Sequence, residues 1–225
     1  MEDSHELLLD TWANMPRHIG KCFIRDGIID PSRWFRAPRK ILFILREAYG
    51  EPDDTEGWDL REVIREEWQG PKGKVWWTVS YWAYGILTAT PHQLPPFPSD
   101  DVAYNAAKEA LLSTAAINIK KSGGKSSSDW DDLVSYVNED GEFIRQQVEL
   151  INPQIAVCGN VWSLIQHLWQ DAQQLYDGVW IANGRVFIDF WHPANYQFPN
   201  QLCYYALSAL LQNSGALNRT PLDIS

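Results

Sequence analysis

An acid and a histidine each follow an apolar run that has the length of a buried strand. Glu47 comes just after the run 41–45, and His192 comes just after the run 185–190. In open α/β sheets, residues past the carboxyl ends of the strands meet at the ligand crevice, so these two side chains can face one substrate. A carboxylate can orient a water molecule and an imidazole can hydrogen-bond a leaving group. The pattern therefore predicts an active site.

The elements that must position these residues alternate between strand and helix. Strands are predicted at 40–45, 114–119, 154–158, Val179–Ala182 and Arg185–Phe190, the last two joined by a tight Asn183-Gly184 turn. Helical patterns occupy about 4–12 with Ser4 as cap, 59–68, 75–88, 100–112 with Ser99 as cap, 141–150, 160–170 and 200–211. Strands separated by helices predict a mostly parallel sheet with helices on both faces.

Length and composition favour one intracellular α/β domain. The chain has 225 residues, of which 45% are apolar, enough for a sizeable core. Three scattered cysteines are too few for a disulfide framework, a zinc knuckle or an iron–sulfur site. Because the sequence has no signal peptide and no long apolar span, we expect a cytoplasmic protein that does not enter a membrane.

The net charge of −10 argues against indiscriminate binding to nucleic acid, since phosphate neutralisation dominates such affinity. Two local basic stretches, 33–40 and 120–125, could still form a basic face for nucleic acid. The alternative is that their charges are simply solvated at the surface. The chain also has 12 tryptophans, several of them within 75–84. That segment is either an aromatic core helix or a platform on which bases stack.

Four segments, in chain order, carry a resemblance to a known family. They are 46–54 (Arg-Glu-Ala-Tyr-Gly-Glu-Pro-Asp-Asp), Asn118 with the three residues after it, 150–159 (Leu-Ile-Asn-Pro-Gln-Ile-Ala-Val-Cys-Gly) and His192-Pro193-Ala194. They resemble, respectively, the Gly-Glu-Ala-Pro-Gly motif, the Thr-Asn-x-x-Lys base-recognition segment, the Ile-Asn-Pro strand and the His-Pro-Ser motif of the bacterial and archaeal, thermophile-type uracil-DNA glycosylases. The resemblance implies a single three-layer α/β/α domain over 1–225 with a central, mostly parallel four-stranded sheet and a peripheral N-terminal helix and C-terminal tail.

The resemblance also implies roles for individual residues. Glu47 would orient the attacking water or stabilise the oxocarbenium-like sugar, and His192 would hydrogen-bond the pyrimidine O2 as it becomes anionic. Asn118 would read the edge of a nucleotide extruded from the stack. Each has a simpler interpretation: a solvated loop acid, a histidine that hydrogen-bonds its own loop, or an amide that satisfies a strand end. Asp53 and Asp54 are alternatives for positioning the water.

Further residues are expected around the base and along the DNA. The base-binding set is Ala48, Tyr49, Gly50, Trp58 and Asn118, with packing at a helix entry as the alternative for Trp58. The DNA-binding set is Lys120, Lys121, Lys125 and Ser126 in one loop, which could instead be disordered, and Asn195 and Tyr196 after His-Pro, where relatives carry a wedge. Hydrophobic packing is the alternative for that second segment.

Departures from the family pattern indicate a divergent member. Arg46 replaces the first glycine, Tyr49 the proline and Ala194 the serine, and the four cysteines of the family's iron–sulfur cluster are missing. Gly50 stands where other branches place a tyrosine that crowds the pyrimidine C5 position, so a C5 substituent could fit.

The resemblance implies a monofunctional DNA glycosylase that removes a flipped uracil or C5-modified pyrimidine from DNA, acting as a monomer without metal or cofactor. The bolder alternative is an anti-phage glycosylase that removes hypermodified, for example glucosylated hydroxymethyl, cytosine. Two other classes remain open: a non-catalytic module of the same fold that binds nucleic acid or protein, and a hydrolase of free nucleosides or nucleotides.

Overall fold

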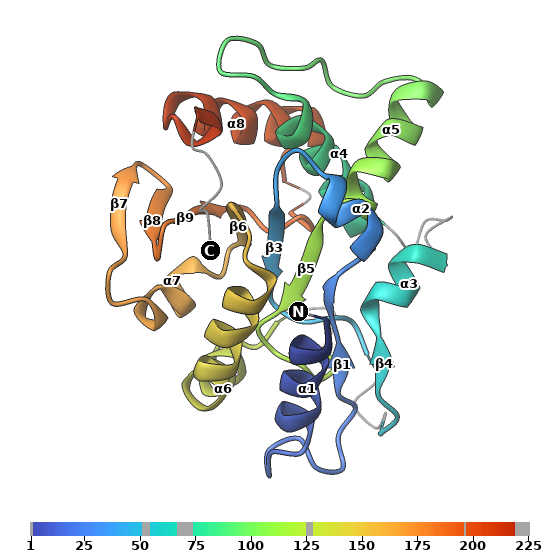
Figure 1. The fold of residues 1–225 in the computed structure, drawn as a ribbon, viewed down its shortest axis with the longest axis vertical. Coiled ribbons are helices and arrows are strands. Elements are labelled where there is room, and N and C mark those ends of the chain that lie inside the picture. Colours follow the sequence, from blue (N-terminus) through green and yellow to red (C-terminus); the bar gives the residue numbers. More distant parts are fainter. Residues whose placement is uncertain (1, 51–54, 67–73, 125–127, 196, 219–225) are drawn as a thin grey trace.

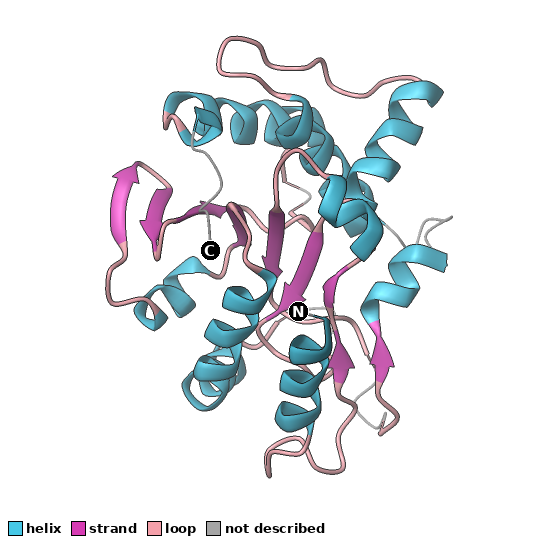
Figure 2. Ribbon diagram, viewed as in Figure 1, coloured by secondary structure: helices cyan, strands magenta, loops and turns pink. Residues whose placement is uncertain are grey.

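The computed structural model describes residues 2–50, 55–66, 74–124, 128–195 and 197–218. Helices cover both faces of a mixed, seven-stranded sheet (Figure 1). Helices and strands alternate along much of the chain, as Figure 2 shows. The α/β class predicted from the sequence is therefore confirmed.

The strands are β1 (Ile24–Arg25), β2 (Gly27–Ile28), β3 (Ile41–Leu45), β4 (Trp58–Asp59), β5 (Ala115–Asn118), β6 (Ile155–Gly159), β7 (Gln173–Tyr176), β8 (Val179–Ala182) and β9 (Arg185–Phe190). The α-helices are α1 (Glu2–Ala13), α2 (Pro31–Arg36), α3 (Leu60–Glu66), α4 (Lys74–Thr88), α5 (Asp101–Leu112), α6 (Trp130–Ile151), α7 (Trp162–Ile165) and α8 (Asn200–Asn213). Short 3₁₀ turns η2 (Gln166–Leu168) and η3 (Ala216–Asn218) follow α7 and α8.

The strand order of the large sheet is β2-β5-β3-β6-β9-β8-β7, and β1 pairs with β4 in a separate two-stranded sheet. Adjacent strands from β5 through β9 run parallel, whereas β2, β8 and β7 are antiparallel to their neighbours. The sheet is thus wider than the four strands expected. The additional edge strands escaped prediction because β2 is very short and β7 is exposed along its whole length and has no apolar run.

Alternating side chains of the sheet build two hydrophobic clusters. One joins Ile41, Phe43 and their neighbours to α4, α5 and α8, and the other joins Leu42, Ile44 and their neighbours to α1, α6 and α7. Strands buried on both faces read as continuous apolar runs, which explains why β3 and β6 could be located from the sequence. The aromatic helix α4 belongs to the first cluster through the buried side chains of Val79 and Trp82, as the core-helix interpretation expects.

Local signals set several element ends. The Asn183-Gly184 turn has positive φ at both residues, 45° and 70°, as a type I′ hairpin requires. Asp100, rather than Ser99, caps α5 through its side chain, and Ser4 lies inside α1 instead of capping it. Helix α6 begins at Trp130 behind an Asp129 cap, so it is much longer than the predicted 141–150 segment.

None of the helices in the described ranges is long and apolar enough to cross a membrane.

Candidate active site

The residues predicted to do chemistry lie at one edge of the large sheet. Because β5, β3, β6 and β9 are parallel, the segments that follow them emerge at the same edge (Figure 1). Glu47 follows β3, Asn118 ends β5, and His192 follows β9. The structure therefore places three of the predicted site residues at the carboxyl ends of parallel strands of one sheet, with β6 between β3 and β9.

Glu47 is almost fully buried, with 6% of its side chain exposed. Its Oε2 accepts a hydrogen bond from Lys120 Nζ at 2.8 Å, whereas the buried Oε1 has no partner within the described part of the chain. A buried acceptor without a donor costs on the order of 1–3 kcal/mol, and more when it is charged. The carboxylate is therefore suited to receive a hydrogen bond from a water molecule or a substrate.

Lys120 holds the Glu47 carboxylate from one side. Its ammonium also contacts Asp132 Oδ2 at 2.7 Å, so it bridges the segment after β3 and the first turn of α6. Burial alone would lower the pKa of Lys120, but hydrogen bonds with Asp132 and Glu47 outweigh it and raise the pKa. Lys120 is therefore a charged positioning residue for Glu47, and not the exposed phosphate ligand that the sequence predicted.

The segments that carry Glu47 and Lys120 run side by side past the ends of their strands. Backbone hydrogen bonds join 45–50 to 119–124, among them Lys120 N to Arg46 O at 3.0 Å and Gly124 N to Ala48 O at 2.8 Å. Two glycines permit this approach, since a Cβ on Gly50 would lie 2.9 Å from the Gly123 Cα. Gly50 thus serves backbone packing here, and whether it also leaves space at a pyrimidine C5 stays a prediction.

The His192 ring has a defined tautomer, and its donor nitrogen has no partner among the described residues. Its Nδ1 accepts a hydrogen bond from the Ala194 backbone N–H at 3.1 Å, which places the proton of the neutral ring on Nε2. Burial, and secondly the positive charge of Arg46, lowers the pKa of His192 to about 4. The ring is therefore neutral near pH 7 and can donate one hydrogen bond from Nε2.

Gly159 shows how closely the strand ends approach one another. A Cβ on this residue would lie 2.8 Å from Leu45 Cδ2 and 3.5 Å from His192 Cδ2. Gly159 ends β6, between β3 and β9, so the side chains of Leu45 from β3 and His192 from the segment after β9 both approach its backbone. Close approach of this kind requires a residue without a side chain.

Asn118 is 3% exposed and pairs in register with Leu45. Its backbone N–H donates to Asp26 Oδ2 at 2.8 Å, whereas its side-chain amide forms no hydrogen bond with any described residue. The strand end is therefore held through the backbone. This leaves the amide of Asn118 available to a ligand, so the simpler interpretation, an amide spent on satisfying the strand end, does not apply.

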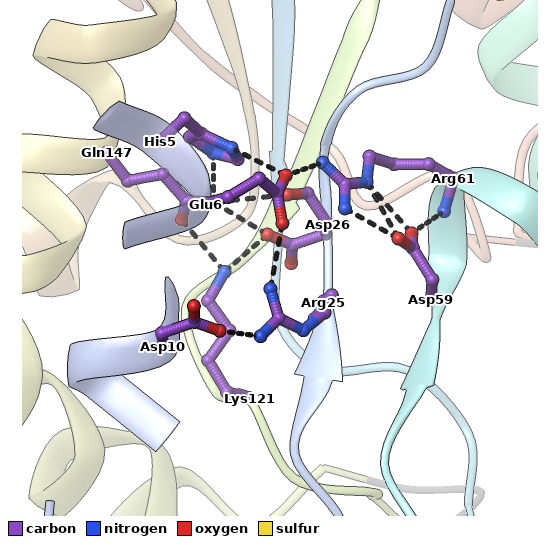
Figure 3. A network of polar contacts seen from close by, with 9 residues as sticks. All are labelled: His5, Glu6, Asp10, Arg25, Asp26, Asp59, Arg61, Lys121 and Gln147. Carbon is purple, nitrogen blue, oxygen red and sulfur yellow. Dashed lines mark hydrogen bonds and ion pairs between the residues drawn. The ribbon is translucent and has the colours of Figure 1, made fainter. Parts of the chain in front are cut away.

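Lys121 is the clearest correction to the sequence-based assignment. It is fully buried, and its ammonium donates to Asp26 Oδ1 at 2.6 Å and to Gln147 Oε1 at 2.9 Å (Figure 3). The same ammonium lies 4.7 Å from the centre of the Trp12 ring. Burial lowers the pKa of Lys121, against the raising effect of Asp26. A lysine in this position supports the core and cannot contact DNA phosphates.

Of the remaining base-binding candidates, Ala48 and Trp58 are half-buried and Tyr49 is exposed. Ala48 and Trp58 pack against the hydrophobic cluster that includes Phe43, which agrees with the packing alternative for Trp58. Trp58 lies in β4 and pairs with Ile24. Tyr49 is 68% exposed and forms a backbone bridge to Gly124.

Some predicted residues have local roles, and others cannot be placed. Asn195 Oδ1 accepts the Gln197 N–H at 3.1 Å, and its own N–H donates to the His192 carbonyl, so it shapes the turn after His-Pro. Asp53, Asp54, Lys125, Ser126 and Tyr196 lie outside the described residues.

Sequence patterns did not indicate three contributors to this site. Asp132 reaches Lys120 from α6, and Trp130 at the start of α6 lies with its ring 5.0 Å from Arg46 Cζ. In the sequence, Arg46 stands out only as a departure from the family motif. The acid-rich start at 129–132 was a possible helix-cap signal, but nothing in it indicates contact with 46–47.

The described residues also bear on a metal site and on the state of the cysteines. No three His, Cys, Asp or Glu side chains among them gather in a way that could hold a metal ion. Cys22, Cys158 and Cys203 are buried and are not joined in disulfides.

No protein-family model matches this chain, and no curated protein matches it significantly.

Proposed function

We propose that this protein is a monofunctional DNA glycosylase that hydrolyses the N-glycosidic bond of a flipped pyrimidine nucleotide. The observation that carries the proposal is the Glu47 carboxylate, which is nearly buried, held by Lys120 through one oxygen and unpartnered at the other. A neutral imidazole, that of His192, follows a parallel strand at the same sheet edge. One group can hold a nucleophilic water while the other donates to the leaving group.

In the proposed reaction, Glu47 Oε1 accepts a hydrogen bond from the attacking water and its negative charge stabilises the oxocarbenium-like sugar. The bond between C1′ and the base nitrogen breaks, and its electron pair leaves with the base. His192 Nε2–H donates to the base oxygen as negative charge develops there. The water oxygen forms the new bond to C1′, and one water proton ends on the departed base.

Asn118 would recognise the base. Its amide carries donors and an acceptor, and it can rotate to meet either uracil or cytosine, so it does not select between them. Uracil or a C5-modified pyrimidine is the proposed substrate, and a hypermodified cytosine of phage DNA is the bolder form of the same proposal. The parallel run of β5, β3, β6 and β9 supports the finer proposal of a uracil-DNA glycosylase-like fold.

One observation favours a second candidate, a hydrolase of free nucleosides or nucleotides. The chain carries a net charge of −10, and the ammonium groups of Lys120 and Lys121 are engaged by carboxylates. Fewer cations are then available for phosphates than the sequence suggested. The same assay can separate the two candidates.

The decisive experiment measures base release. Duplexes containing uracil, hydroxymethyluracil, hydroxymethylcytosine or glucosylated hydroxymethylcytosine are incubated with the protein, and abasic sites are detected by strand cleavage in alkali. Free nucleosides form a parallel series. Product from DNA supports the glycosylase, turnover of nucleosides alone indicates the hydrolase, and a shifted band without product indicates a binding module.

Variants test the assignment of residues. Glu47→Gln and His192→Ala should each slow cleavage by about 10²–10³-fold, the usual effect of losing one positioned electrostatic group. Glu109→Gln and His167→Ala change the same residue types at exposed positions on α5 and η2, and should cleave like the wild type. Near-wild-type rates in folded Glu47→Gln and His192→Ala proteins would refute the assignment.

A further inference from the structure

Arg46 has an unusual electrostatic environment for a half-buried arginine. Its guanidinium forms no hydrogen bond and no ion pair with any described residue, and its Nε is shielded from solvent without a partner. Among the other described arginines, only Arg36 also forms no hydrogen bond or ion pair with a described residue, and Arg36 is exposed on α2. Arg46 is therefore a partly desolvated cation without a counter-ion within the described ranges.

The neighbouring carboxylate does not neutralise Arg46. Glu47 directs Oε2 to Lys120 and leaves Oε1 unpartnered, so no ion pair with the guanidinium forms. Burial lowers the pKa of Arg46, with a smaller raising effect from Glu47. An arginine has five N–H donors in a fixed plane, and leaving charged donors desolvated and unpaired is costly. Such an arrangement is expected where the partner is supplied by a ligand.

The position of Arg46 is fixed at two points. Its carbonyl accepts the Lys120 N–H at 3.0 Å, which holds the backbone against the segment after β5. Its Cζ lies 5.0 Å from the centre of the Trp130 ring, so the guanidinium is held at an aromatic surface by a cation–π contact. An aromatic ring engages the face of a guanidinium, so the N–H groups at its edge stay available.

Arg46 also lies within electrostatic range of both proposed catalytic groups. Its charge acts on the His192 ring, and the Glu47 charge acts on it in turn. Arg46 directly precedes Glu47 after β3, at the sheet edge where His192 follows β9, so its donors are near the place where a ligand of these two groups would bind. The two sources of an oxyanion there are a phosphate flanking the flipped nucleotide and the oxygen of the departing base.

We infer that Arg46 is an oxyanion-binding residue of this site and donates hydrogen bonds to a phosphate or base oxygen of the bound nucleotide. The inference rests on the proposed function for the identity of the nucleotide, but not for the oxyanion chemistry. A guanidinium fork fits a phosphate in two parallel hydrogen bonds, which a lysine cannot reproduce. Arg46→Lys should therefore fall between the wild type and Arg46→Gln.

The first test measures binding without catalysis. Inorganic phosphate, dUMP and free uracil are titrated into the wild type, Arg46→Gln, Arg46→Lys and Arg36→Gln, and the indole N–H signal of Trp130 is followed by NMR. If Arg46 binds a phosphate, Arg46→Gln should weaken binding of inorganic phosphate and dUMP by about 10- to 100-fold; if it binds the base oxygen, the same loss should affect uracil and dUMP. Arg36→Gln should bind all three probes like the wild type. Thermal unfolding of each variant confirms that it is folded.

The second test separates the two sources in single-turnover cleavage. If Arg46 holds a phosphate, Arg46→Gln weakens binding of uracil-containing and ordinary duplexes alike and lowers the salt slope by about 1, at an unchanged saturating rate. If it stabilises the departing base, the salt slope and the affinity for ordinary duplexes are unchanged, and the saturating rate falls by about 10²–10³-fold. Either result supports the inference.

Two further outcomes keep the proposals distinguishable. If no substrate is cleaved but dUMP binding still depends on Arg46, the proposed function fails and the oxyanion role stands. If Arg46→Gln matches Arg36→Gln in binding all three probes and in any cleavage, the inference about Arg46 is wrong.

Discussion

Lys120 Nζ lies 2.8 Å from Glu47 Oε2, and this ion pair joins the ends of two parallel strands at the candidate active site. The same ammonium contacts Asp132, so the start of α6 fixes the pair from outside the sheet. A carboxylate held at one oxygen has a defined orientation, and its other oxygen stays free for a water molecule. Preorganisation of this kind is what electrostatic catalysis requires.

Replacing Lys120 with methionine should therefore impair catalysis. Glu47 loses its hydrogen-bond donor, so we expect cleavage of the preferred duplex to slow by about 10- to 100-fold while binding changes little. Lys120→Arg should recover part of the rate. Asp132→Asn removes the second carboxylate that holds the ammonium but leaves the pair between Lys120 and Glu47, so it should slow cleavage less than Lys120→Met. A Lys120→Met protein with an unchanged single-turnover rate would contradict the positioning role.

Gly124 offers a steric test of the same carboxylate. A Cβ at this position would overlap the Glu47 side chain at Cδ, Cγ and Oε2. Gly124→Ala should therefore displace Glu47 and reduce cleavage at least tenfold, with substrate affinity retained. Gly141→Ala, in α6, would meet the flexible end of the Leu168 side chain in η2, and it is the control for a tight glycine remote from the site. Equal rates for the two variants would show that the Glu47 position is not critical.

The buried pair of Lys121 and Asp26 predicts a large effect on stability. Lys121→Met leaves an unpaired carboxylate in the core and should lower the free energy of unfolding by about 3–5 kcal/mol, as urea denaturation can measure. Lys121→Met combined with Asp26→Asn should recover part of this loss. Exposed Lys21→Met is the control and should be nearly neutral. If Lys121→Met were as stable as the wild type but bound DNA more weakly, Lys121 would be a surface ligand after all.

Local sequence patterns identified the strands that position the site. β3 and β6 are continuous apolar runs, and the Asn183-Gly184 turn fixed the β8–β9 hairpin. The fully exposed β7 escaped because it has no apolar run. In the first half of α6, Leu133, Tyr136 and Val137 do form an apolar stripe at helical spacing, but the many acids around them give this stretch the composition of a solvated surface.

Whether Lys120 and Lys121 are buried or exposed could not be predicted from local sequence patterns. Lys120 and Lys121 are adjacent in a loop rich in glycine, serine and lysine, which is the composition of a flexible basic segment. The partners that bury them, Asp132 for one and Asp26 with Gln147 for the other, are distant in sequence or lie on other elements. Whether a charge is solvated or paired depends on such contacts, which no local pattern encodes.

His192 provides a prediction of pH dependence. Burial, then the charge of Arg46, lowers the pKa of this ring from its ordinary value of 6.5 to about 4. As pH falls from 6.5 toward 4, the unfolded chain takes up a proton that the folded protein does not, so stability is lost over that interval. The loss reaches about 2–3 kcal/mol near pH 4.5, because each pKa unit corresponds to about 1.4 kcal/mol.

His192→Gln removes this titration. As the pH falls from 7 to 4.5, the wild type should therefore lose about 2–3 kcal/mol more of its free energy of unfolding than the variant does. His92→Gln, at an exposed position, is the control. The His192 ring signal in NMR should titrate near pH 4 in the wild type and at higher pH in Arg46→Gln, since the lowering effect of the guanidinium is lost. A midpoint near 6.5 in the wild type would mean that the ring is neither buried nor close to Arg46, and a catalytic His192 would then lose its neutral form within the physiological range.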